Sequence, residues 1–285
     1  MLQRVGDIAD AHVAGRARSG MFRKTPSQAT TAGWWADLSM APGTPVPNYY
    51  AAAPLVAKRL DPFDGIFHGD AVTPAELHLT RFGLVTSSAN FVGQVMLLDY
   101  LLIYPFVDCD SGDLQTMTNT VTLDRYTDGV GVQVMAVAVA PTLGSGRFTF
   151  TYLDQNGVEQ TSPTQVCSTT GANIATIVTS QPTVSGTVQP SGPFLPLASG
   201  STGVRAITSC TFSILNGGLM ALVLVKPLLD LAIREASTEV EAPMPWGRAG
   251  APRVYDSSYL NMICSPAGSI ASAVLTGYAD FVWSA

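Results

Sequence analysis

The 285-residue chain combines few charged residues with many turn-forming ones. Charged residues make up 13%, about half the usual ~25%, while Gly and Pro contribute 26 and 19 residues. This composition excludes a coiled coil, a helical bundle, a collagen and a disordered acidic tail. The net charge of -6 argues against a nucleic-acid partner. A surface so poor in charge favours burial against neighbouring molecules, so we expect a homo-oligomer.

The first 90 residues predict an extended, largely irregular N-terminal arm. A short helix is expected within residues 2–17. The stretch after it is rich in Thr, Ala, Gly and Pro, and its prolines deny it a continuous helix or a central strand. The alternative is a long loop that packs back on its own domain. We favour the arm because structureless loops of this length are uncommon inside compact domains.

Aromatic and basic residues give this predicted arm two ways to bind a partner. Buried rings are the usual anchors of protein interfaces, and clustered basic residues attract an acidic surface. A solvated, mobile N-terminus is the other explanation of the basic cluster. The predicted interface residues are Trp34, Trp35, Tyr49, Tyr50, Arg16, Arg18 and Arg23. Deleting residues 1–60 is then expected to leave a folded body that binds poorly.

Residues 91–285 predict an all-β domain. Long apolar or alternating runs at 92–106, 130–140 and 147–154 indicate strands, and a final strand is expected at 270–283. Two turn sequences, Asn156-Gly157 and Asn216-Gly217-Gly218, each predict a hairpin between the runs that flank them. One helix is expected within 227–237. The pattern favours an antiparallel β-sandwich, jelly-roll-like in its connections.

No segment predicts a membrane span or a metal-binding cysteine motif. The most apolar run, 219–233, is interrupted by Lys226, Pro227 and Asp230 and is shorter than the ~20 residues that cross a bilayer. An apolar leader segment is not evident, so synthesis in the cytoplasm is expected. The four cysteines are widely spaced and are expected to be buried free thiols. They are Cys109, Cys167, Cys210 and Cys264.

The sequence gives few candidates for catalysis, and we expect neither an enzyme nor a cofactor. The three histidines, His12, His68 and His78, lack the spacing of a zinc site. The DCDSGD segment places carboxylates at close spacing, where a calcium site and a polar turn are both open, with the turn favoured. Its carboxylates are Asp108, Asp110 and Asp113.

Two segments resemble structural proteins of tailed-bacteriophage virions. One is RKTPSQATTAGWWADLSMAPGTPVPNYYAAAPL, and the other, GRFTFTYLDQNGVEQTSPTQV, is similar to β-sandwich head-decoration (cement) proteins. The resemblance implies a protein on the outer capsid surface of the virion. Its partner would be the major capsid protein, and it would stabilise the head by bridging neighbouring subunits. Such proteins are often trimers, so a homotrimer is expected.

Alternative functions remain open at this point. A major capsid subunit of the common tailed-phage fold carries a long spine helix, for which the chain shows no helical stripe. A receptor-binding or glycan-hydrolysing tail protein needs a pocket with aromatic rings and carboxylates. Candidate residues for such a pocket are Trp246, Tyr255, Asp256 and Tyr259. A secreted host sandwich is the weakest alternative, because no leader segment is evident.

Overall fold

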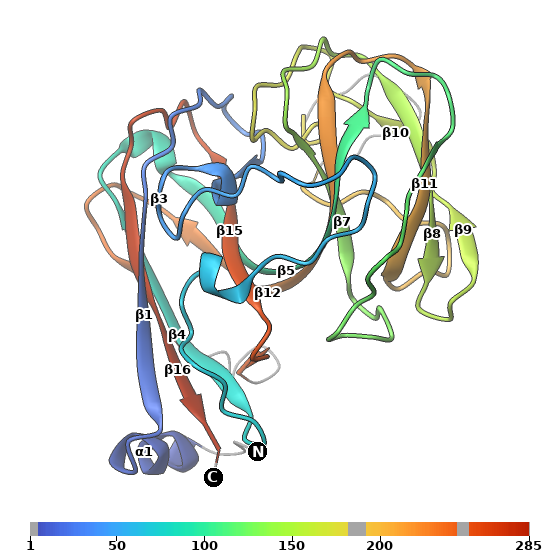
Figure 1. Cartoon of the computed structure of the whole chain (residues 1–285). Coiled ribbons are helices and arrows are strands. Elements are labelled where there is room, and N and C mark those ends of the chain that lie inside the picture. Colours follow the sequence, from blue (N-terminus) through green and yellow to red (C-terminus); the bar gives the residue numbers. More distant parts are fainter. Residues whose placement is uncertain (1–4, 182–191, 244–250, 285) are drawn as a thin grey trace.

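Three antiparallel sheets form the framework of the described part of the chain (Figure 1). The computed structural model describes residues 5–181, 192–243 and 251–284. We call the sheets terminal, central and distal. The terminal sheet has the order β13 (Val240–Pro243), β4 (Leu77–Thr86), β16 (Leu275–Trp283), β1 (Ala17–Lys24) and β3 (Gly43–Thr44), and β14 (Arg253–Val254) also pairs with β4.

The other two sheets and the helices complete the described fold. The central sheet has the order β2 (Ala36–Asp37), β15 (Tyr259–Pro266), β5 (Gly93–Asp108), β12 (Leu219–Ile233) and β7 (Gln133–Ala138). The distal sheet has the order β10 (Gln165–Val166), β8 (Arg147–Asp154), β11 (Val204–Ile214) and β6 (Gln115–Thr116), and β9 (Glu159–Thr161) pairs with β8. The helices are α1 (Val5–Val13) and the 3-10 turns η1 (Leu38–Met40), η2 (Pro62–Asp64) and η3 (Ala89–Phe91).

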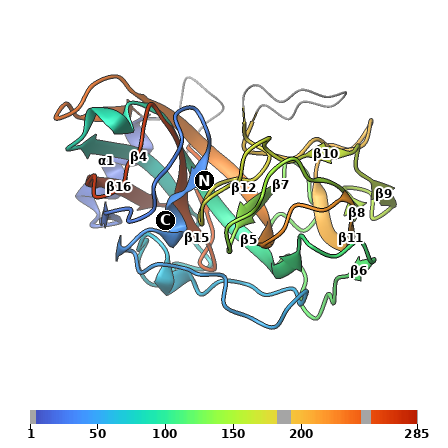
Figure 2. The same ribbon diagram turned by 90° about the horizontal axis from the view of Figure 1, so that it is seen from above.

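The long strands β5 and β12 join the two halves of the molecule. They pair along almost their whole lengths and run from one half to the other (Figure 2). One end of this pair packs against the terminal sheet and the other against the distal sheet, so the central sheet belongs to two sandwiches. The β5 sequence is apolar almost throughout because both of its faces are covered. The all-β sandwich class expected from the sequence is therefore confirmed.

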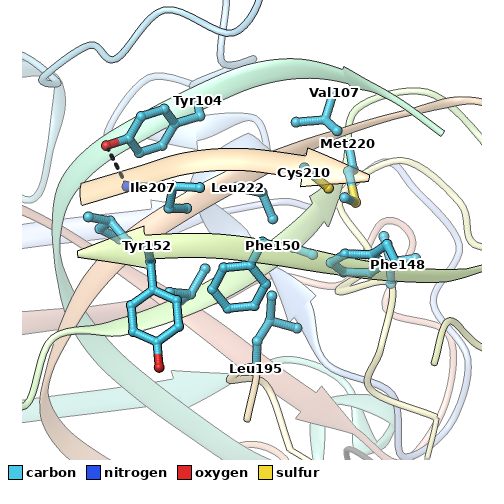
Figure 3. Close-up of a cluster of buried hydrophobic side chains, with 14 of the residues drawn as sticks. Tyr104, Val107, Phe148, Phe150, Tyr152, Leu195, Ile207, Cys210, Met220 and Leu222 are labelled. Carbon is cyan, nitrogen blue, oxygen red and sulfur yellow. Dashed lines mark hydrogen bonds between the residues drawn. The ribbon is translucent and has the colours of Figure 1, made fainter. Parts of the chain in front are cut away.

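The three largest apolar cores of the described residues correspond to these three sheets. The distal core packs aromatic rings of β8 against aliphatic side chains of β12, and the Tyr104 hydroxyl accepts a hydrogen bond of 3.1 Å from the Ile207 amide (Figure 3). The terminal core includes Phe82 and Phe281. A third core covers the opposite face of the central sheet, where the segment 35–50 contributes Trp35, Met40 and Tyr50.

The extended arm is not what the structure shows for the first 90 residues. β1 pairs with β16 over its whole length, and β4 pairs with β16, β13 and β14. The accessible surface is 11540 Å² for 29.9 kDa, close to the ~11,700 Å² of a compact monomer, whereas an extended arm would expose much more. The expected boundary at residue 90 is wrong, because strands on both sides of it share one sheet.

The two Asn-Gly turn sequences indicated where strands end, but only one of them indicated which strands pair. The hairpin at Asn156-Gly157 is confirmed by the antiparallel β8–β9 pair. The hairpin at Asn216-Gly217-Gly218 is wrong: β11 pairs with β8 and β6, whereas β12 pairs with β5 and β7. This turn carries the chain from one sheet of the distal sandwich to the other. An Asn-Gly sequence predicts that the chain reverses direction, whereas the burial of the side chains decides which sheet each strand joins.

The helix expected within 227–237 is also wrong, since residues 227–233 continue β12. From Leu229 to Ile233 the more buried positions alternate with the more exposed ones, which is a strand period. No helix in the described part of the chain is long and apolar enough to cross a membrane. All four cysteines are buried free thiols, as the sequence predicted.

Candidate interaction surface

The buried carboxylate of Asp37 fastens the segment 35–50 to the central sheet. Asp37 lies in β2, and its carboxylate accepts hydrogen bonds from the Ser39 amide (2.8 Å), the Ser39 hydroxyl (2.8 Å), the Tyr100 hydroxyl (2.7 Å) and the Tyr50 hydroxyl. Burial raises the pKa of Asp37, and these donors oppose the shift by stabilising the charged form. Because all the donors are consumed internally, this cluster is structural and offers no reactive group to a substrate.

Lys24 gives this region a measurable pH dependence. Its ammonium is buried and donates to the carbonyls of Ala41 (3.1 Å) and Pro45 (2.8 Å). Burial lowers the pKa of Lys24 to about 8, against the attraction of nearby Asp37. Above pH 8 the folded chain has released a proton that the unfolded chain keeps until about pH 10.4. The free energy of unfolding should therefore contain a term that rises with pH in this window, by up to ~1.4 kcal/mol per unit.

Urea unfolding of the wild type and of Lys24→Met at pH values between 8 and 10 measures this term. We expect the unfolding free energy of the wild type to rise with pH relative to that of Lys24→Met, because the variant has no proton to release at this position. Parallel curves would contradict the assignment.

A second buried polar cluster lies where the terminal and distal cores meet. Asp99 of β5 accepts hydrogen bonds from Arg125 Nε (2.8 Å) and Nη2 (2.6 Å), from the Ser258 hydroxyl (2.8 Å) and from the Tyr259 amide (3.1 Å). Arg125 also donates to the Tyr100 carbonyl at 2.8 Å. Both ends of the ion pair are almost inaccessible to water. The cluster joins β5, the start of β15 and the loop before β7.

The same region contains serine, histidine and aspartate, but not in a catalytic order. The Ser258 hydroxyl donates to Asp99, while His68 Nε2 lies 2.9 Å from the Ser258 backbone carbonyl. Nucleophilic catalysis requires the histidine to contact the serine hydroxyl and the aspartate to contact the histidine. Burial lowers the pKa of His68, and all three side chains are buried. This arrangement does not present an activated nucleophile to a substrate.

Three of the predicted interface residues lie inside the chain's own fold. Trp34 belongs to the distal core, whereas Trp35 and Tyr50 belong to the third core. Each is almost fully buried, so none of these rings is available to anchor the chain on a partner. The prediction that they are external anchors is wrong because the aromatic segment covers the central sheet of its own chain.

The other predicted interface residues are separated from one another. Tyr49 is exposed and lines a groove between residues 46–51 and 58–64. Arg18 packs over the Trp283 ring and donates to the Asp70 carbonyl at 2.9 Å. Arg16 lies just before β1, and exposed Arg23 lies within it. The structure therefore does not gather these residues into one binding surface.

The acidic segment 108–113 forms a polar turn at one end of the distal sandwich. The Asp110 amide donates to the Asp108 carboxylate at 2.9 Å, and the Asp113 amide donates to the Ser111 hydroxyl at 3.2 Å. Among the described residues, no group of three or more His, Cys, Asp or Glu side chains is arranged to hold a metal ion. Asp108, Asp110 and Asp113 are all exposed, so the turn presents three carboxylates to the solvent.

Exposed aliphatic side chains gather beside this acidic turn. Three loops meet there: the Leu143 amide donates to the Asn216 carbonyl (2.6 Å), and the Asn216 amide donates to the Cys109 carbonyl (2.8 Å). Four large side chains on and next to these loops are between 46% and 79% exposed. We call them the aliphatic tip: Leu114, Leu143, Ile214 and Leu215. Two of its residues lie where β11 ends and the turn that leads to β12 begins.

The three described residues suggested for an alternative pocket, Tyr255, Asp256 and Tyr259, have different surroundings. Tyr255 packs edge-on against Tyr126, and the Asp256 carboxylate accepts hydrogen bonds from the Thr73 hydroxyl and the Val72 amide. Tyr259 is buried and lines the groove that also contains Tyr49. Trp246 lies outside the described residues.

Comparisons with known proteins add little to this description. No protein-family model matches the chain, and no curated protein matches it. A solved structure of the D431N mutant VP2 protein of infectious bursal disease virus, in derived T=1 particles, aligns with 93% of this chain and 77% of that chain. The sequence identity is 10% and the TM-score is 0.17. A TM-score of this size does not indicate a common fold.

Proposed function

We propose that this chain is a non-enzymatic structural protein of a virus particle, which binds the outer capsid surface through the aliphatic tip and bridges neighbouring capsid subunits. The observation that carries the proposal is the tip itself. Exposed aliphatic groups that are contiguous and rimmed by polar residues mark protein–protein contacts. Leu143 is 79% exposed on a loop held by main-chain hydrogen bonds, so the patch is presented by a fixed backbone.

Charge defines the surface that the tip fits. Asp108, Asp110 and Asp113 border the aliphatic groups, and the whole chain carries a net charge of -6. The complementary partner surface is apolar at its centre and carries Lys or Arg around it. We identify the partner as the major capsid protein because of the resemblance of the sequence to head-decoration proteins. The buried polar clusters support a structural role, since their serine, histidine and carboxylate groups are engaged within the fold.

Replacing two leucines of the aliphatic tip with serine tests this function. The double variant Leu143→Ser and Leu215→Ser should weaken co-sedimentation with purified capsids of the encoding virus, prepared without the chain. A loss of about tenfold or more is expected from the apolar area removed. Val158→Ser is the matched control, because Val158 is 53% exposed and lies in the β8–β9 turn, away from the tip. Unchanged binding of the double variant, or an equal loss in the control, would refute the assignment.

The acidic turn beside the tip should contribute separately to capsid binding. Asp110→Asn with Asp113→Asn should reduce binding at low ionic strength and have little effect at high salt, because exposed charges are screened.

The proposed trimer should have three times the chain mass of 29.9 kDa in light scattering. A monomer mass both free and on the capsid would contradict the trimer without affecting the role of the tip.

A further inference from the structure

We propose that the groove between residues 46–51 and 58–64 binds a neutral oligosaccharide. The groove has a volume of about 790 Å³, within the range of ~300–1,000 Å³ that is usual for ligand sites. It lies on the segment that crosses in front of the central strands in Figure 1, away from the aliphatic tip. It is therefore a second binding site, distinct from the capsid-binding surface proposed above.

Aromatic rings supply the apolar part of the site. Phe63 on η2 is 65% exposed and Tyr49 is 56% exposed, and both line the groove. Burial of Tyr50 beneath the segment holds the backbone next to Tyr49, and the Asp61 carboxylate caps η2 by accepting from the Phe63 amide at 3.0 Å. Both rings therefore extend from fixed backbone. The C–H faces of a pyranose ring are apolar and pack against such rings.

Polar groups in the groove match the hydroxyls of a sugar. Asn48 Nδ2 is buried and has no hydrogen-bond acceptor among the described residues, although Asn48 Oδ1 accepts from the Tyr50 amide at 3.0 Å. Asn48 Nδ2 is shielded from the solvent, so the donor that a ligand in the groove can reach is the Lys58 ammonium, which gives one hydrogen bond to the Ala51 carbonyl at 3.3 Å and has further N–H groups. No described residue donates a hydrogen bond to the exposed Asp64 carboxylate, which leaves it as an acceptor. The groove thus offers both a donor and acceptors, which a hydroxyl requires.

Charge balance distinguishes the class of sugar. The lining contains two cations, Lys58 and Arg59, and two carboxylates, Asp61 and Asp64. Arg59 already donates to the Thr122 carbonyl at 2.9 Å through Nε. Because positive and negative groups are equal in number, the site does not favour an anionic polysaccharide. The balance of charges favours an uncharged sugar chain.

NMR titration of the ¹⁵N-labelled full chain with cellohexaose, maltohexaose and chitohexaose tests the proposal. At least one should bind and shift resonances of the groove, and Tyr49→Ala and Phe63→Ala should each weaken it about tenfold. Phe67→Ala is the matched control, since Phe67 is a 51% exposed phenylalanine that does not line the groove. The variant Leu143→Ser with Leu215→Ser should bind sugar normally, which separates this site from the capsid-binding tip.

Four results would overturn the proposal. The first is the absence of binding by all three oligosaccharides at about 1 mM. The second is an equal loss in Phe67→Ala, which would place the ligand elsewhere. The third is tighter binding of polygalacturonate, which would contradict the charge argument. The fourth is preferential binding of a decaproline peptide, which would identify the aromatic groove as a polyproline site instead.

Discussion

Deletion of residues 1–60 is expected to abolish cooperative folding rather than release a folded sandwich. The deletion removes β1, which pairs with β16 over eight residues, and thereby exposes an edge of the terminal sheet. It also removes Trp34, Trp35 and Tyr50 from two apolar cores. Circular dichroism during thermal unfolding should show no sharp transition for the truncated chain. A transition as cooperative as that of the full chain would contradict this account of the N-terminal segment.

A single substitution tests the same point without deleting chain. Trp35→Ala should lower the free energy of unfolding by ~3–5 kcal/mol, because it creates a large cavity in the third core. Tyr49→Ala is the control from the same segment: its side chain is exposed, so a change within about ±0.5 kcal/mol is expected. Urea denaturation gives both values. If both variants lost less than about 1 kcal/mol, the segment would be only loosely attached to the central sheet.

Removing either partner of the buried Asp99–Arg125 pair should lower the free energy of unfolding. Arg125→Met leaves the Asp99 carboxylate buried without its two guanidinium donors, at 2.6 and 2.8 Å, and such changes typically cost ~3–5 kcal/mol. Asp99→Leu removes the buried carboxylate partner of Arg125 and leaves it only the partly exposed Asp124 carboxylate, at 2.9 Å from Nη1. Both single variants should show a lower urea midpoint. The double variant should be less damaged than the sum of the two, because no uncompensated charge remains.

An exposed ion pair provides the control for this comparison. Arg81 and Glu241 approach to 2.8 Å on the outside of the terminal sheet. Arg81→Met should change stability little, because water and salt screen exposed charges. If Arg125→Met were as mild as Arg81→Met, the buried Asp99 cluster would not contribute strongly to the stability of the fold.

Periodicity predicted several strands after residue 91 because it reflects local burial, but it did not reveal β1 or β4. The apolar run containing β5 and the alternating RFTFTYLD of β8 were both recognisable. Their partners were not, since pairing depends on contacts between residues far apart in sequence. The same limit explains the N-terminal segment. Its prolines and aromatic rings fit an external arm and an internal cover equally well, and only the central sheet behind Trp35 decides between them.

The candidate surfaces were harder to predict than the strands. Asp99 had a usable signal: one carboxylate inside MLLDYLLIY must find a buried partner. The sequence did not identify that partner, because Arg125 lies in a loop 26 residues away. The aliphatic tip had no signal at all. Leu114, Leu143 and Ile214 are separated by strands, and a lone leucine in a turn is ordinary, so only their convergence in space marks a surface.

The most direct test of the central claim is photo-crosslinking on assembled particles. A photoreactive benzoylphenylalanine replaces Leu143 at the aliphatic tip or Val158 in the β8–β9 turn, and each protein is bound to purified capsids before irradiation. Mass spectrometry then identifies the crosslinked peptides. The account predicts that the tip probe crosslinks to the major capsid protein, near basic residues of its outer surface, and that the probe at 158 does not. Equal crosslinking from both positions, or crosslinking only from position 158, would contradict it.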